Sequence, residues 1–306
     1  MKLSKSAKFL YRLEAKGLLN CLPDSVYLKL IYRARLGRRL DLKSPKSFNE
    51  KLQWLKLYDR KPDYTTMVDK VEAKKYTASI IGEDYIIPTL GVWDRFDDID
   101  FDTLPNQFVL KCSHDSGGLV FCKDKKSFDK AAAKEKIEQC LKHEYYRHGR
   151  EWPYKNVKPR ILAESFLETS DPMGITDYKF FCFNGKPKIL YISRGLENHA
   201  TAEISFYDLQ GQELPFHRED FKPYHNAVLP ANFEQMKEIA ARMAKKISSP
   251  FVRIDLYSIH QKVYFSEITF SPCSGFVPFE PKEWDETLGS WINLPKKQTT
   301  GKESIL

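Results

Sequence analysis

Two acidic residues near the C-terminus, Asp255 and Glu267, have the surroundings of metal ligands. Each lies in a strand-like run of apolar residues, and a polar turn at residues 258–262 separates the two runs. A hairpin built from these runs would hold the two carboxylates side by side, where like charges repel. Such a pair becomes favourable around Mg²⁺, which is commonly held by one or two carboxylates together with phosphate oxygens. The pattern therefore points to nucleotide chemistry, and the alternative is an ordinary hairpin with a polar face.

A lysine followed by a glycine-containing turn is the second chemical element of the chain. Lys111 lies in the strand-like segment 107–112, the turn covers residues 113–118, and a second strand-like segment, 119–122, follows. A lysine on a strand can hold phosphate oxygens, and the backbone N–H groups of a glycine turn can approach phosphates closely. Most such turns only connect strands, so this element gains weight only in combination with the acidic pair.

The first eighty residues carry helix signals. We expect one helix to begin at Asp24 and Ser25, which would cap it, and to end at Gly37. Residues 47–50, Ser-Phe-Asn-Glu, form a capping box for a second helix, which ends before Pro62. A third helix is expected over residues 68–81. Together they predict a helical N-terminal region.

Strand signals increase after residue 107, and their mixture with helices predicts an α+β fold. The clearest is the Asn184-Gly185 turn, which would join the runs 178–183 and 188–192 into a hairpin. The other expected elements are helices over 128–142 and 233–247, a strand over 161–167 and a hairpin around 209–212.

The composition is that of a folded protein. The 306 residues are 42% hydrophobic and 13% aromatic. No apolar run approaches the roughly 20 residues that a membrane-spanning helix needs, and the N-terminus has no signal-peptide pattern, so we expect a cytoplasmic protein. The six cysteines are scattered without a CxxC pair, which predicts free, mostly buried thiols rather than a zinc site.

Positive charge gathers at the N-terminus. Residues 1–62 contain sixteen Lys and Arg but five Asp and Glu, so they account for the whole net charge of +8. A solvated helical surface explains this excess, and so does docking to an anionic polymer or, peripherally, to the inner face of a membrane. Nucleic acid is not expected as a partner, because no reader motif accompanies the charge. The residues we expect to dock are Arg33, Arg35, Arg38 and Arg39.

In order and spacing, these segments resemble the ATP-grasp ligases, most closely their TupA-like branch, over roughly residues 20–290. The segments around Lys70 and Lys111 are similar to the small lobe that closes on the triphosphate. The strand with Glu164 is similar to the hinge, and Arg253-Ile-Asp255 with Glu267 is similar to the metal segment. The resemblance implies an α+β ATP-grasp fold whose two lobes clasp ATP. The implied divisions are a helical basic region at 1–62, a small lobe at 63–158, a large lobe at 159–295 and a flexible tail at 296–306.

The resemblance also implies roles for individual residues. Arg253 would act on the transferring phosphoryl group, although it could equally be a structural partner of its neighbouring acids. Arg194 would bind the substrate carboxylate or the acyl phosphate. The implied Mg²⁺ ligands are Asp255, Glu267 and Thr269. The implied ATP-binding residues are Lys70, Lys111, Ser113, Ser116, Gly117, Gly118, Glu164, Ser165, Phe166, Leu167, Asp171, Asp177 and Lys179.

Within that set, the backbone of residues 165–167 would bond the adenine edge, and either Asp171 or Asp177 would take the ribose hydroxyls. Two positions depart from the family pattern. Thr269 stands where many members have Asn, and its hydroxyl is a poorer Mg²⁺ ligand. Lys179 stands in place of Arg and cannot make the planar fork of a guanidinium.

What the resemblance implies is an ATP-dependent, Mg²⁺-dependent carboxylate–amine ligase that works through an acyl phosphate. Its substrates would be a uronic acid of a surface polysaccharide, or of a lipid-linked precursor, and an amino acid or amine. One alternative is a glycosyltransferase of the same pathway, for which Asp98, Asp100 and Asp102 have the spacing of a metal motif. Another is a binding module without catalysis, which the two departures favour.

Overall fold

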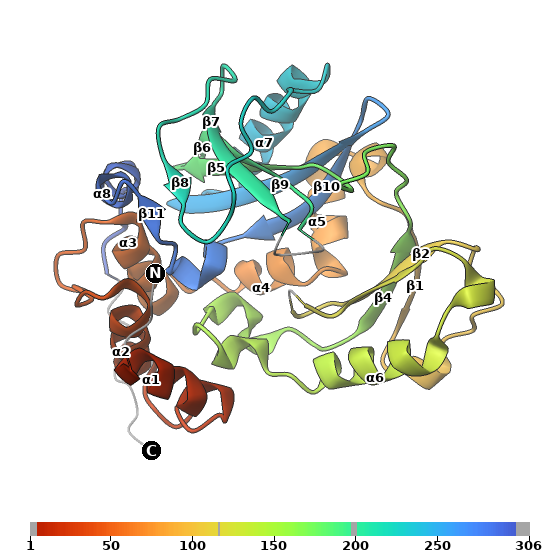
Figure 1. Ribbon diagram of the computed structural model, residues 1–306, viewed down its shortest axis with the longest axis horizontal. Coiled ribbons are helices and arrows are strands. Elements are labelled where there is room, and N and C mark those ends of the chain that lie inside the picture. Colours follow the sequence, from red (N-terminus) through yellow and green to blue (C-terminus); the bar gives the residue numbers. More distant parts are fainter. Residues whose placement is uncertain (1–4, 116, 197–200, 298–306) are drawn as a thin grey trace.

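The computed structural model describes residues 5–115, 117–196 and 201–297, and it contains a helical N-terminal layer and two main sheets (Figure 1). Its helices are α1 (Lys5–Ala15), α2 (Asp24–Leu36), α3 (Phe48–Tyr58), α4 (Asp63–Val68), α5 (Glu72–Ile81), α6 (Lys130–Leu141), α7 (Phe233–Ile247) and α8 (Glu283–Ser290). Its strands are β1 (Thr89–Trp93), β2 (Phe108–Cys112), β3 (Leu119–Cys122), β4 (Ile161–Ser165), β5 (Asp177–Phe183), β6 (Lys186–Arg194), β7 (Glu203–Asp208), β8 (His217–Arg218), β9 (Phe251–Ile259), β10 (Lys262–Thr269) and β11 (Phe279–Glu280).

The N-terminal helices begin and end largely where the sequence predicts. Gly37, with φ +71°, ends α2, and the capping box of α3 is confirmed, since Ser47 and Glu50 bond each other's backbone N–H groups. The expected cap at Asp24 is wrong. Pro23 precedes the helix, and the Asp24 carboxylate instead accepts hydrogen bonds from Arg60 and Tyr146.

The helix expected over residues 68–81 is divided into α4 and α5. Asp69 has an extended backbone, with ψ 112°, and its carboxylate accepts the Val71 N–H at 2.9 Å. Arg160 binds the same carboxylate at 2.6 Å. A side chain that bonds local backbone in this way competes with helix formation, so the chain turns at Lys70.

A five-stranded antiparallel sheet, in the order β10-β9-β5-β6-β7, forms the larger lobe. One face packs on α7 and α5 through residues such as Phe180, Leu190 and Ile254. The opposite face packs on α3 and α8, where Phe48 meets Phe251 edge to face with ring centroids 4.9 Å apart. Because strand side chains alternate between faces, each strand supplies both hydrophobic clusters.

The predicted Asn184-Gly185 hairpin between β5 and β6 is confirmed. Both turn residues have positive φ, +49° and +80°, as a two-residue turn that matches strand twist requires. The chain also turns back after β7, where Asp208 N–H donates to the Gln212 carbonyl at 2.9 Å. There Tyr207 forms an isolated bridge with Glu213, so the hairpin around 209–212 is minimal.

A four-stranded antiparallel sheet, in the order β1-β4-β2-β3, forms the smaller lobe and lies to the right in Figure 1. Its apolar face packs on α6, where Ala133 and Ile137 meet Phe108 and Leu110. The predicted division at 158/159 would assign β4 to the large lobe, whereas β4 pairs with β1 and β2. In the described part of the chain, no helix is both long and apolar enough to cross a bilayer.

Candidate active site

The β9–β10 hairpin places Asp255 directly opposite Glu267, as the sequence predicts. The tight turn between the strands pairs Phe265 with Leu256, and the register then shifts by one residue before Glu267. Without that bulge at Ser266, the alternation of side chains would put Glu267 on the far face of the sheet. The bulge therefore brings both carboxylates to one face.

Two cations hold this acidic pair. Arg253 donates from Nε and Nη2 to the two oxygens of Asp255, at 2.7 and 2.6 Å, and from Nη2 to Glu267 Oε1 at 2.6 Å. Lys179 Nζ lies 2.8 Å from Asp255 Oδ2 and 3.1 Å from Asp177 Oδ1. The repulsion that a divalent cation was expected to relieve is thus already offset by the protein's own charges.

The electrostatics of the two carboxylates differ because their burial differs. Asp255 is fully buried, and burial raises its pKa despite Arg253 and Lys179. The Glu267 side chain is 38% exposed. Burial within the site would raise the pKa of Glu267, but Arg253, Lys179 and Lys70 outweigh this effect and lower it to about 2. Glu267 is therefore an anion throughout the physiological pH range.

The donor set fits Mg²⁺ in kind, since it consists of hard oxygen ligands. Glu267 also fits in position, because it is partly exposed, and Arg253 and Thr269 bind its Oε1. Asp255 would have to exchange one contact with Arg253 or Lys179 to bind a metal. Thr269 bonds Glu267 Oε1 at 3.0 Å and accepts from Arg253 at 3.1 Å, so it belongs to the same cluster.

A second cluster surrounds Glu164 of β4, with Lys111 from β2 of the small lobe and Lys74 from α5. Lys111 Nζ lies 2.5 Å from Glu164 Oε2, and Lys74 Nζ lies 2.7 Å from Oε1. Burial lowers the pKa of Lys111, but Glu164 outweighs it and raises the value to about 12. Glu267 of the large lobe also acts on the pKa values of Lys111 and Lys70, so the two lobes present their charges to a shared site.

Lys70 and the loop after Lys111 lie together. The Lys70 amino group donates to the carbonyl of Asp115, and the Lys70 N–H donates to the Ser113 carbonyl at 3.0 Å. Gly118 approaches its neighbours closely, because an added Cβ would lie 2.8 Å from Cys112 Sγ. Gly117 has open space around it, and Ser116 lies outside the described residues.

Ser113 has structural partners in this state. It is fully buried, its Oγ donates to the Lys158 carbonyl at 2.9 Å, and its N–H donates to the Arg160 carbonyl at 2.9 Å. The hinge backbone is also partly engaged, since Ser165 N–H donates to the Pro88 carbonyl at 3.0 Å. The contacts of Ser113 and Ser165 with ATP stay predictions that need these bonds to be exchanged.

The rest of the expected nucleotide contacts lie at the end of β4, in the segment that follows it and at the start of β5. Phe166 packs edge to face on Phe121, 6.3 Å away, and Leu167 follows as a half-buried residue. Asp177 contacts Lys179 beside Asp255, whereas Asp171 accepts the Met173 N–H in a turn. The choice of ribose ligand between the two aspartates stays open.

Arg194 lies at the end of β6 and is bound by a carboxylate. Its guanidinium forms a fork on Glu203 Oε2, at 2.8 and 2.6 Å, and lies 4.1 Å from the ring centroid of Tyr224. A substrate carboxylate would have to compete with Glu203. The role predicted for Arg194 therefore depends on that exchange.

Sequence reasoning missed Lys74 and the buried pair of Lys56 and Glu151. The spacing Lys70-x-x-x-Lys74 could have indicated the first, because residues four apart share a helix face. Lys56 donates to the Ser274 carbonyl at 2.8 Å, and Ser274 Oγ donates to Glu151 at 2.7 Å. Burial raises the pKa of Glu151 to about 7 and lowers that of Lys56 to about 7. No sequence signal marked this contact between distant segments.

Two other arrangements have less to support them as reaction centres. Cys112, Asp115 and Cys140 have ligand atoms within 4.8 Å of one another, but Asp115 already accepts the Gly118 N–H and burial raises the pKa of the Cys112 thiol. All six cysteines are free, and three of them are buried. The glycosyltransferase-like aspartates 98, 100 and 102 lie exposed in turns before β2, and the pairs in both main sheets are antiparallel.

Comparison with solved structures finds D-alanine–D-alanine ligases and an L-amino acid ligase. A D-alanine–D-alanine ligase from Helicobacter pylori is 16% identical, with a TM-score of 0.47, over 82% of this chain and 68% of that one. The ligase from Bacillus anthracis complexed with ATP is 16% identical, with a TM-score of 0.38, over 67% and 54%. An L-amino acid ligase from Bacillus licheniformis is 15% identical, with a TM-score of 0.41, over 72% and 47%. This chain thus spans about half to two thirds of their length.

The sequence comparisons are more specific. No curated protein sequence matches the chain. The TupA-like ATP-grasp family, however, matches residues 50–293, which is well over half of the chain and includes both charged clusters. The match agrees with the expected α+β fold and with the two lobes described above. The chain therefore belongs to the TupA-like ATP-grasp family.

Proposed function

We propose that the protein uses ATP to join the carboxylate of a uronic acid to an amine, which is an amino acid or another primary amine. The observation that carries the proposal is the meeting of charged groups from both sheets around one site. Arg253, Asp255 and Glu267 lie on the large sheet, Lys111 lies on the small sheet, and Lys70 lies in the turn between α4 and α5. Lysines that can bind phosphates, next to carboxylates that can bind a metal, suit phosphoryl transfer. In that reaction, catalysis consists mostly of positioning the reactants and stabilising charge.

The reaction would run in two steps. A carboxylate oxygen attacks the γ-phosphorus and ADP leaves, which yields an acyl phosphate. The amine nitrogen then attacks the acyl carbon, inorganic phosphate leaves, and the nitrogen loses a proton. The product is an amide, with one ADP and one phosphate for each bond.

The residues of this chain would hold the charges that these steps create. Lys70 and Lys111 would bind phosphate oxygens, and Arg253 would stabilise the transferring group and then the tetrahedral oxyanion. Glu267 and Asp255 would hold Mg²⁺, which would neutralise negative charge on the phosphates. Lys179 lies at the same face and would hold the Asp255 carboxylate in place through its 2.8 Å contact.

The choice of substrate rests on the family and on charge. Members of the TupA-like branch are associated with surface polysaccharides, and uronic acids are the sugars that bring a carboxylate. The excess of basic residues in the N-terminal helices suits an anionic glycan or a precursor at a membrane surface. The acceptor would therefore be a uronate-bearing glycan or its lipid-linked precursor.

The test is a screen of uronic acids against amines with purified protein, ATP and Mg²⁺, which follows ADP release and product mass. A uronic acid labelled with ¹⁸O should pass one label to the released phosphate. Hydroxylamine should trap the acyl phosphate as a hydroxamate without the natural amine. Formation of AMP and pyrophosphate, or of unlabelled phosphate while amide accumulates, would contradict the mechanism. Release of UDP from a nucleotide sugar would support a glycosyltransferase instead.

A further inference from the structure

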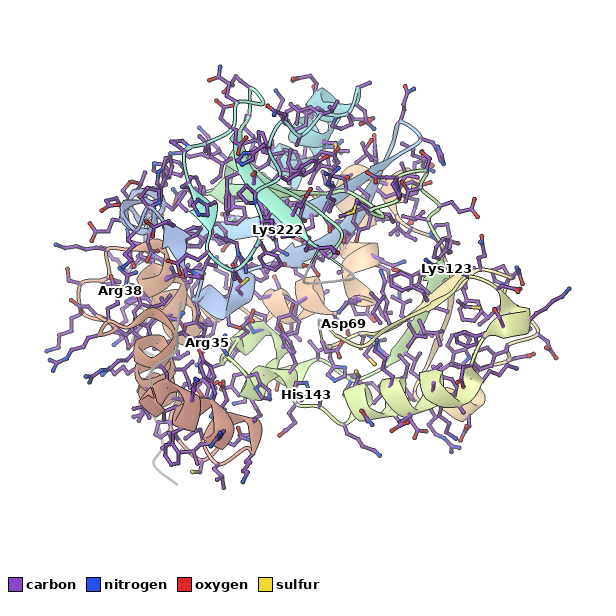
Figure 2. All side chains as sticks on the ribbon, in the orientation of Figure 1. Arg35, Arg38, Asp69, Lys123, His143 and Lys222 are labelled. Atoms are coloured by element: carbon purple, nitrogen blue, oxygen red, sulfur yellow. The ribbon has the colours of Figure 1, made fainter. Side chains whose placement is uncertain are left out.

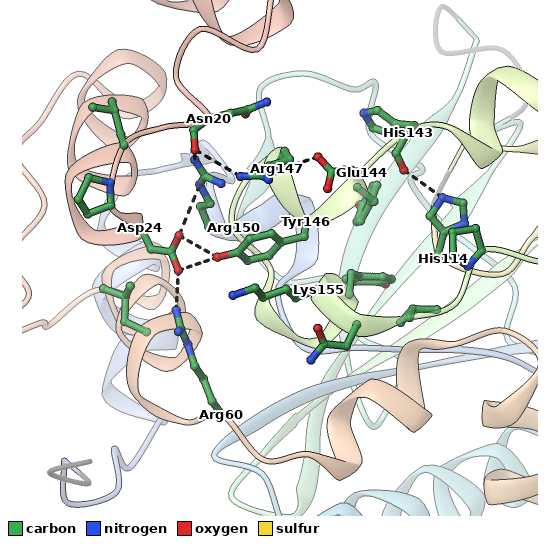
Figure 3. Close-up of a pocket in the computed structure, with 18 of the residues that line it drawn as sticks. Asn20, Asp24, Arg60, His114, His143, Glu144, Tyr146, Arg147, Arg150 and Lys155 are labelled. Atoms are coloured by element: carbon green, nitrogen blue, oxygen red, sulfur yellow. Dashed lines mark hydrogen bonds and ion pairs between the residues drawn. The ribbon is translucent and has the colours of Figure 1, made fainter. Parts of the chain in front are cut away.

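A large cavity lies between the N-terminal helices and residues 141–159, outside the two charged clusters (Figure 3). Its volume of about 1,530 Å³ exceeds the roughly 300–1,000 Å³ of ordinary small-molecule pockets. Neither Glu164 nor Asp255 lines it, and one wall comes from the start of α2 and the end of α3. The space suits a ligand larger than a single small molecule.

The wall of the cavity is basic. It contains six Lys and Arg side chains but two carboxylates, Asp24 and Glu144. Asp24 is occupied by Arg60 at 2.7 Å, by the Tyr146 hydroxyl at 2.7 Å and by Arg150 at 3.6 Å. Glu144 is occupied by Arg147 at 3.0 Å. Both carboxylates of the wall are therefore already paired with basic side chains of the wall.

Three exposed lysines of the wall have no such partner. For Lys142, Lys155 and Lys297, the described residues provide no carboxylate within ion-pair distance. Figure 3 shows the Lys155 side chain directed toward the space between Tyr146 and Arg60. Free ammonium groups that face one cavity favour a ligand with several negative charges.

The same wall is rich in tyrosine. Tyr58, Tyr145, Tyr146 and Tyr154 all line the cavity, and two of them lie beside the unpaired lysines. Lys297 Nζ is 4.1 Å from the ring centroid of Tyr58, and Lys155 Nζ is 5.5 Å from that of Tyr146. Tyrosine presents an apolar ring face and a polar tip, which together match the C–H face and the hydroxyls of a sugar ring.

The wall of the cavity adjoins the two charged clusters. His114 lies in its wall and directly precedes Asp115, whose carbonyl binds Lys70. Tyr154 also lies in the wall, and the charges of Glu267 and Arg253 act on its pKa, which burial raises. A chain held in the cavity could therefore extend to the site of carboxylate activation.

We propose that this cavity binds a segment of anionic glycan, several uronate-bearing sugars long, next to the sugar that reacts. The proposal rests on the proposed function for the identity of the glycan. Cations and aromatic rings line the same large space, and carboxylated sugar rings can bind both. Lys142 and Lys155 would pair with uronate carboxylates, and the tyrosines would pack on the rings.

The test is direct binding of an oligogalacturonate of about six sugars, measured by calorimetry at low salt without ATP. The double variant Lys142→Gln/Lys155→Gln should weaken binding about tenfold or more, which corresponds to about 1.4 kcal/mol. Lys158→Gln is the matched control, because Lys158 is exposed, lies three residues from Lys155, pairs with Asp94 and does not line the cavity. The control should bind as the wild type does, and wild-type binding should weaken as salt rises.

Three results would overturn the proposal. One is equal binding by the double variant and the wild type. Another is equal binding of neutral maltohexaose, which would remove the role of charge. The third is tighter binding of polyuridylate, competing fully with the oligogalacturonate, which would assign the cavity to nucleic acid. Because ATP is absent, these outcomes are independent of whether the protein forms amides. If the protein binds the glycan but forms no amide, the proposed function is contradicted and the assignment of the cavity to a glycan is not.

Discussion

The β9–β10 cluster and the cavity beside α2 both combine basic and acidic side chains, but they differ in how the cations are held. In the cluster, Arg253 and Lys179 are buried and contact Asp255 at 2.6–2.8 Å. In the cavity, Lys142 and Lys155 are exposed, and the described residues offer them no carboxylate. Substitutions in the first region should break a network, whereas substitutions in the second should change only the affinity for a ligand.

The largest expected effect is at Asp255. Asp255→Ala would leave Arg253 and Lys179 buried without their shared partner, and breaking a buried ion pair in this way costs about 3–5 kcal/mol. Removal of a metal ligand should also lower ATP-dependent turnover about a hundredfold or more. Urea unfolding and ADP release measure the two effects.

Glu267→Gln is the control for that variant. Glu267 is 38% exposed and Asp255 would still hold both cations, so the loss of stability should be smaller than for Asp255→Ala, while turnover falls about a hundredfold. If Asp255→Ala unfolds at the same urea concentration as the wild type, the cluster is not the ion-pair network described above.

A smaller effect is expected at Lys111. Lys111→Gln removes one partner of Glu164, but Lys74 remains at 2.7 Å, so stability should change little. Loss of one phosphate-binding charge should raise the KM for ATP by about tenfold to a hundredfold. Hydrogen exchange of residues 113–118 should slow when a non-hydrolysable ATP analogue binds. Equal exchange with and without the analogue would contradict a phosphate-covering role for this loop.

The pH dependence of stability should identify Glu267 as a paired anion. Its pKa is lowered from 4.5 to about 2, so the folded state binds a proton less readily than the unfolded state. This stabilisation is fully present above pH 4.5 and is lost as the pH falls through about 2. The difference in unfolding free energy between the wild type and Glu267→Gln should therefore shrink across that window. A constant difference would show that Glu267 titrates normally.

The smallest effects are expected on the N-terminal region, at α2 and the segment that follows it, where Figure 2 shows Arg35 and Arg38. Arg38 binds Asp285, and Arg35 lies 3.7 Å from Glu14 and stacks on Phe276, so these two have structural partners. Arg33 and Arg39 are exposed.

Arg33→Gln/Arg39→Gln should weaken binding to anionic vesicles by about 1 kcal/mol for each charge, without loss of stability. Co-sedimentation with vesicles at low and high salt measures this. If vesicle binding is insensitive to both salt and substitution, these arginines belong to an ordinary solvated surface and do not dock a partner.

Much of the fold followed from local signals. Ser47 and Glu50 lie within one turn, so their capping box needs no tertiary partner, and Gly37 and Asn184-Gly185 mark positions of positive φ. Asp24 and Asp69 misled the helix predictions for the opposite reason. Both carboxylates bind arginines from distant segments, Arg60 and Arg160, which no local pattern reveals.

The sequence alone determined which residues are candidates for the chemistry, because Asp255, Glu267 and Lys111 each stand out among apolar strand neighbours. Only the tertiary structure decided how they are placed. The bulge at Ser266 turns Glu267 to the face of Asp255, and a strict two-residue alternation would have turned it away. The cavity likewise exists only because residues about 120 positions apart, Asp24 and Tyr146, meet in the folded chain. The type of each side chain is fixed by the sequence. The face of the sheet on which it lies and the residues that surround it depend on strand register and packing.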